Sequence, residues 1–165
     1  MRALETFFKD KTIHAIYSSP LLRTRQTARL INNFIRQDRV LTSSHLLETN
    51  TPFDGRPVKD LEAIEWEIYK NSPAPYEQPE DIFKRALQFI HKTRRMNPGK
   101  QIVAVTHGDV ILFLALWANG YEASAENKRK VEHKEIRLVY PATASVTTLR
   151  WEDGLDLPKF EYYQG

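Results

Sequence analysis

The chain has 165 residues, of which 41% are apolar and 27% charged, with a net charge of +3 and no cysteine. This length is enough for one folded domain with its own core, and the composition is ordinary for a globular protein. The lack of cysteine excludes disulfides, thiolate metal sites and a cysteine nucleophile. The small basic excess does not indicate a nucleic-acid partner. We therefore expect a single domain over residues 1–165 that binds no nucleic acid.

The N-terminal segment has acidic residues and no continuous apolar run, so it does not have the pattern of a secretory signal. The longest apolar stretch, residues 110–118, is too short to cross a bilayer. We expect a cytoplasmic protein without a membrane association.

Apolar periodicity and turn residues predict the elements of the first part of the chain. In order, they are a helix at 1–10 that begins in mid-pattern, a strand at 13–17, a turn at 18–20 whose serines offer capping hydroxyls, a helix at 21–36, a weak strand at 40–42 or 46–47, and a loop at 49–56.

The later part of the chain shows the clearest helix signal, because Pro79 suits a first helical turn and acidic residues follow it. In order, the predicted elements are a helix at 57–70, a loop at 71–78, a helix at 79–96, a strand at 102–105, a helix at 110–117, a loop or exposed helix at 121–134, and strands at 135–140, 144–151 and 160–163. Strands that alternate with helices predict a three-layer α/β/α sandwich with a mainly parallel sheet.

The segment at residues 101–120 places His107 where a buried strand ends and a helix begins. Ligands gather at the carboxyl ends of strands in such sheets, and helix N-termini attract anions. Gly108 permits a sharp turn there, and Asp109 is expected to cap the helix with its carboxylate. The alternative is a histidine held only by backbone hydrogen bonds.

The sequence YSSPLLRTRQTA at residues 17–28 has the same strand–turn–helix order, with Arg23 in the first turns of the helix. If both strands lie in one sheet, Arg23 reaches the same edge as His107, where its planar guanidinium suits two phosphate oxygens. Arg25 and Arg29 point elsewhere at helical spacing and are better explained as a solvated basic face. Glu48 follows a weak strand and becomes a candidate only if it joins Arg23 and His107.

These motifs, in this order, resemble the histidine phosphatase superfamily, also called phosphoglycerate-mutase-like. The resemblance rests on YSSPLLRTRQTA, LLE at 46–48, a PED-led helix with Arg85, VTHGDVI at 105–111 and ATASVTTLRW at 142–151. It implies that Arg23 clamps a phosphate and that His107 binds the transferring phosphoryl group, with Gly108 beside it. It also implies that Glu48 donates a proton to the leaving oxygen, without a metal or other cofactor.

The family's nucleophile is a histidine in an Arg-His-Gly motif, and this chain contains no such tripeptide. The other histidines, His14, His45, His91 and His133, lack that context and are expected to be structural or solvated. The resemblance places the motif before the first helix, so we expect an N-terminally incomplete domain that lacks the first family strand and has negligible turnover. The gap would allow a dimer or pairing with an N-terminal segment.

Several functions stay open from the sequence. The intact parent would be a phosphomonoesterase or, less favoured, a mutase, acting on a small phosphorylated substrate. A second hypothesis is a non-catalytic module that binds a phosphate anion. A third, a metal hydrolase using His107 and Asp109, has too few ligands. Substrate specificity is expected to lie in residues 49–78 and 121–134, where Trp66, Tyr69 and Tyr76 are candidates for a pocket, although core packing explains Trp66 equally well.

Overall fold

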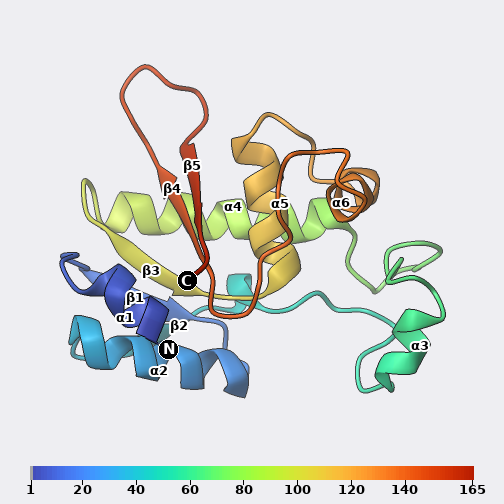
Figure 1. The fold of residues 1–165 in the computed structure, drawn as a ribbon, viewed down its shortest axis with the longest axis horizontal. Helices are drawn as coiled ribbons and strands as arrows, with labels where there is room; N and C mark the ends of the chain where they lie inside the picture. Colours follow the sequence, from blue (N-terminus) through green and yellow to red (C-terminus); the bar gives the residue numbers. More distant parts are fainter. Residues whose placement is uncertain (1) are drawn as a thin grey trace.

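A parallel sheet of three strands organises the protein (Figure 1). The computed structural model describes residues 2–165. The sheet has the order β2-β1-β3, with β1 at Ala15–Ser18, β2 at Val40–Thr42 and β3 at Ile102–Val105. The register pairs Ser18 with Thr42 on one side and with Val105 on the other. All three strands therefore end at the same edge of the sheet.

Two helices cover one face of this sheet: α1 at Arg2–Phe8 and α2 at Leu22–Ile35. Alternate strand residues point toward them, as expected for a strand whose two faces are both packed. The cluster between these helices and the sheet contains Leu4, Phe8, Ile13, Ile16, Ala28, Ile31 and Val103.

The opposite face carries α4 at Pro79–Met96, which packs in turn against α5 at Gly108–Ala118. Tyr17 and Phe89 meet edge to face, with their ring centroids 5.3 Å apart. The start of α4 is stabilised because the Asp81 carboxylate accepts a hydrogen bond from the Gln78 backbone N–H at 3.0 Å. Helices on both faces of a parallel sheet confirm the predicted α/β class.

The last two strands, β4 at Val146–Arg150 and β5 at Lys159–Tyr163, form a separate antiparallel pair. Val146 packs against the same cluster as Val103, so this pair lies beside the parallel sheet. Among residues 2–165, β3 pairs only with β1 and β4 only with β5. The family resemblance predicts a further strand in the parallel sheet, and this stays a prediction.

Two predicted elements are wrong in the structure. The helix expected at 57–70 is confined to α3 at Val58–Glu62, because Glu65 and Trp66 adopt positive φ angles of 52° and 61° that end it. The weak strand expected at 40–42 or 46–47 is β2 at Val40–Thr42, and Ser44–Leu46 is a 3₁₀ turn. Residues 135–140 form no strand: Ile136 is buried in the cluster around α5, so their apolar pattern serves packing rather than strand pairing.

Residues 121–134, left open between a loop and an exposed helix, contain α6 at Ala125–Glu132. The Ser124 hydroxyl caps it by accepting a hydrogen bond from the Asn127 backbone N–H at 3.2 Å. Across residues 2–165, no helix combines the length and the apolar character that crossing a membrane requires.

Candidate phosphate-binding site

Parallel pairing of β1 with β3 brings two strand–turn–helix units to one edge of the sheet. The Ser19 backbone N–H donates to the Val105 carbonyl at 2.9 Å and continues this pairing past the strand ends. From there the chain enters α2 on one side and α5 on the other. Arg23 lies in the first turn of α2 and His107 is the residue preceding α5, so both reach the same edge.

His107 is the buried centre of the site, with a side chain only 3% exposed. Its Nε2 lies 3.0 Å from the Ser19 hydroxyl, and its Nδ1 lies 3.1 Å from Glu48 Oε2. The Ser19 hydroxyl oxygen also accepts from the Leu21 backbone N–H at 3.4 Å. An N–H on Nδ1 donates to Glu48, and Nε2 pairs with the Ser19 hydroxyl.

Arg23 closes a triangle with these two residues. Its Nη2 lies 3.3 Å from Glu48 Oε2 and 3.2 Å from His107 Nδ1. The Arg23 side chain is 60% exposed, so most of its guanidinium donors face solvent and are available to a ligand. Arg25 and Arg29 are exposed and line a separate hollow with Val40.

The surroundings of Glu48 favour the charged form of its carboxyl. Burial by itself would raise the pKa of its carboxyl, but the hydrogen bond and charge interaction with His107 act to lower it. The Thr49 backbone N–H and the charge of Arg23 add to the effect, and the pKa falls below its ordinary value. A carboxylate therefore occupies the donors that an incoming anion would use.

Arg85 of α4 holds the segment that carries Glu48. Its Nη1 donates to the His45 carbonyl at 2.9 Å and its Nη2 to the Glu48 carbonyl at 3.3 Å. The same guanidinium forms a two-pronged ion pair with Glu77, at 2.7 and 3.2 Å. A forked donor of this shape suits several acceptors at once, and it joins three segments of the chain.

The expectation that Asp109 caps α5 is wrong. Its carboxylate accepts hydrogen bonds from the hydroxyls of Tyr69 and Tyr140, the latter at 2.8 Å. The Tyr69 hydroxyl also lies 3.2 Å from that of Thr49, so the network reaches the residue next to Glu48. Burial raises the pKa of Asp109 above its ordinary value, although the charge of Lys128 and both tyrosine hydrogen bonds act to lower it.

Gly108 has a local reason to be glycine. A Cβ at this position would collide with the Tyr140 hydroxyl, so the missing side chain is what allows Tyr140 to approach Asp109. Its predicted role beside a bound phosphate is compatible with this, because it is the first residue of α5 and lies next to His107.

Within residues 2–165, no group of three or more His, Asp or Glu residues is arranged to hold a metal ion. Both Asp109 oxygens are engaged by tyrosines, which removes the second ligand of the metal hypothesis. Of the other histidines, His14, His91 and His133 are exposed, and His45 contributes its backbone carbonyl to Arg85.

The structure thus brings together Arg23, Glu48 and His107, and it adds partners that sequence reasoning missed. Ser19 was read only as a capping residue, and Tyr69 only as a pocket candidate. Tyr140 was assigned to a strand, and Arg85 only to a helix motif. The contacts of these four residues span 31 to 88 positions of sequence, so no local pattern reveals them.

Comparison with known proteins indicates a single protein family. Residues 1–154 match the sequence profile of the histidine phosphatase superfamily (branch 1). The chain is 29% identical over 141 residues to phosphoglycerate mutase-like protein 4 of Arabidopsis thaliana, a match that covers 79% of this chain. It spans only 59% of the length of that relative.

Solved structures share the fold. The YhfR protein of Bacillus stearothermophilus superposes with a TM-score of 0.75 at 19% identity, covering 95% of this chain and 76% of that protein. A mycobacterial glucosyl-3-phosphoglycerate phosphatase gives 0.73 at 18% identity, with 97% and 79% covered. The alpha-ribazole phosphatase of Shigella flexneri gives 0.59 at 23% identity, with 74% and 64% covered.

Proposed function

Because this chain belongs to the histidine phosphatase superfamily, we propose that its Arg23–Glu48–His107 cluster binds the phosphoryl group of a small phosphomonoester. We propose further that the cluster serves metal-independent hydrolysis in the intact protein. The observation that carries the proposal is the convergence of these three side chains within 3.3 Å at one edge of the sheet. The phosphatases among the structural relatives support the same reaction class.

Binding of a phosphate requires the Glu48 carboxylate to lose its charge or to move away from Arg23 and His107. A phosphoryl dianion and an ionised carboxylate compete for Arg23 and for the His107 N–H, and like charges at this distance repel. The conflict is relieved when Glu48 takes up a proton or swings toward solvent, where its side chain is already 38% exposed. A protonated Glu48 then lies close to the phosphoryl group and can supply the proton that a leaving alkoxide needs.

Arg23 and His107 would act on the charge that spreads over the oxygens of the transferring phosphoryl group. Arg23 offers the forked donor of a phosphate clamp, and His107 offers an N–H held in place by Ser19. The free N–H groups at the start of α5 lie beside His107 and add a third source of positive potential. This arrangement stabilises charge without a metal.

Arg23→Ala tests the binding half of the proposal. We expect inorganic phosphate to bind the 165-residue chain, and the variant to bind it about ten- to a hundredfold more weakly, since hydrogen bonds to charged groups are worth about 1.5–3 kcal/mol. Titration calorimetry gives both affinities. Arg25→Ala is the matched control, because Arg25 is exposed on the same helix and should leave the affinity unchanged. Equal affinity for the parent and Arg23→Ala would remove the proposed function.

Hydrolysis needs an activated nucleophile, which the resemblance assigns to an Arg-His-Gly histidine that is absent from this sequence. We expect the 165-residue chain to release negligible p-nitrophenol from p-nitrophenyl phosphate. A version extended at its N-terminus with a strand and an Arg-His-Gly turn should do so readily. Robust activity of the unextended chain that His107→Ala abolishes would contradict this expectation.

A non-catalytic phosphate-binding module is the second candidate. In the part of the chain that the structure describes, His107 is the one histidine in the cluster. The site therefore offers hydrogen-bond donors to an anion but no second histidine to act as nucleophile, which favours this candidate. An extended version that still shows no turnover, while binding phosphate through Arg23, would favour this candidate over the enzyme.

A further inference from the structure

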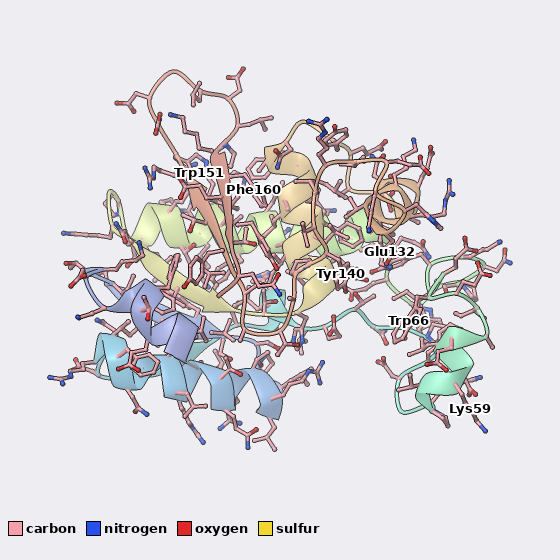
Figure 2. The ribbon with its side chains drawn as sticks, in the orientation of Figure 1. Lys59, Trp66, Glu132, Tyr140, Trp151 and Phe160 are labelled. Carbon is pink, nitrogen blue, oxygen red and sulfur yellow. The ribbon has the colours of Figure 1, made fainter. Side chains whose placement is uncertain are left out.

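A pocket of about 440 Å³ opens directly beside the phosphate-binding cluster, and Glu48 and Thr49 form the boundary between the two. The polypeptide around α3 provides one wall, and α6 with the loop that follows it provides the other. Figure 2 shows Trp66 next to α3 on one side, with Glu132 and Tyr140 on the other. Of the three residues of the phosphate cluster, Glu48 lines this space and Arg23 and His107 do not.

The wall near α3 is apolar and includes Phe53, Leu61, Trp66 and Ile68. Trp66 is 48% exposed, so core packing does not explain an indole at this position. A tryptophan that lines a hollow while facing solvent provides a flat apolar surface for a ligand. Tyr69 is instead buried against Asp109, and Tyr76 does not line the pocket.

The charges of the pocket are mainly negative. Glu48, Asp54, Asp109 and Glu132 line it, and among the described residues of the lining Lys128 is the one cation. The Lys128 ammonium is already engaged, because it donates to the Glu132 carboxylate and its side chain is only 7% exposed. The pocket therefore offers no free cation to a second anionic group of a substrate.

We propose that this pocket receives the alcohol portion of the phosphomonoester and selects a flat, uncharged apolar group over one that carries a carboxylate or a second phosphate. This inference rests on the proposed function. An ester whose phosphoryl group lies against Arg23 and His107 directs its bridging oxygen past Glu48 and into the pocket. An aryl group there meets Trp66 and Phe53, whereas a carboxylate meets an acidic lining in which Lys128, the one cation among the described lining residues, is already paired with Glu132.

Phosphonates that cannot be hydrolysed separate these contributions by titration calorimetry on the 165-residue chain. We expect phenylphosphonate to bind about tenfold more tightly than methylphosphonate, because its ring is removed from water against Trp66. Phosphonoacetate, which carries a carboxylate, should bind no more tightly than methylphosphonate. A clear preference for phosphonoacetate would overturn the inference.

Trp66→Ala should reduce the preference for phenylphosphonate to about twofold or less, since most of the ring's apolar contact is lost, and should leave the affinity for inorganic phosphate unchanged. Leu155→Ala is the matched control, because Leu155 is also 48% exposed but lies outside the pocket. Phe53→Ala provides a second variant, and circular dichroism checks that each variant is folded.

The outcomes separate this inference from the proposed function. If inorganic phosphate binds through Arg23 but phenylphosphonate and methylphosphonate bind equally, the phosphate site stands and the pocket proposal is overturned. If the phenyl preference survives both Trp66→Ala and Phe53→Ala, the ring lies elsewhere and the proposal is again overturned. If the chain binds no inorganic phosphate, both proposals fail together.

Discussion

Replacing Arg85 by alanine is expected to lower the free energy of unfolding by about 3 kcal/mol or more, the scale found when one partner of a buried ion pair is removed. The Arg85 and Glu77 side chains are only 15% and 21% exposed, so the Glu77 carboxylate would lose its counter-ion with little access to water. The carbonyls of His45 and Glu48 would also lose their donor. Urea unfolding measures the change.

Arg95→Ala is the matched control, since Arg95 is exposed on the same helix and should change the unfolding free energy by less than about 0.5 kcal/mol. Arg85→Lys should recover only part of the loss, because an ammonium group cannot serve Glu77 and two carbonyls in this forked arrangement. Adding Glu77→Ala to Arg85→Ala should cost little more, since the unpaired carboxylate is then gone. An Arg85→Ala protein as stable as its parent would contradict this description of the Glu48 segment.

Asp109→Ala is expected to lower the free energy of unfolding by about 1–3 kcal/mol at neutral pH, the range for a polar group that loses a hydrogen-bond partner. The Tyr140 hydroxyl loses its acceptor, and Tyr69 keeps only Thr49. Asp109→Asn should lose less, since an amide retains one acceptor oxygen and removes a buried charge. Asp156→Ala, at an exposed aspartate, is the control and should be near neutral.

The stability difference between the parent and Asp109→Asn should depend on pH. Burial raises the pKa of Asp109 in the folded state, so the folded protein holds this proton more tightly than the unfolded chain does. The contribution of Asp109 to stability is therefore fully present below its ordinary pKa of about 3.9 and is lost as the pH rises through the raised value. Urea unfolding at several pH values should show the parent losing stability relative to Asp109→Asn as the pH increases. A difference that grows in favour of the parent would show that hydrogen bonding outweighs burial.

Local patterns were sufficient for the elements that form the layered fold. The helix at 79–96 was predicted with the bounds that α4 has in the structure, because a proline, two acidic residues and a strict apolar periodicity all favour the same helix. The prediction failed at 57–70 and 135–140, where apolar residues pack against other elements or face a pocket. Periodicity alone cannot distinguish such residues from a helix face or a strand.

For the site, sequence patterns supplied the candidates: an arginine at the start of a helix that follows one short strand, a histidine at the end of another, and a glutamate between them in the chain. How they meet depends on the fold, because the parallel register of Ser18 with Val105 sets which strand ends are neighbours. The fold also lowers the pKa of Glu48, joins Asp109 to two tyrosines instead of the start of α5, and places Trp66 on a pocket. Burial and contacts across tens of residues set each of these properties, and neither is encoded in the spacing of nearby residues.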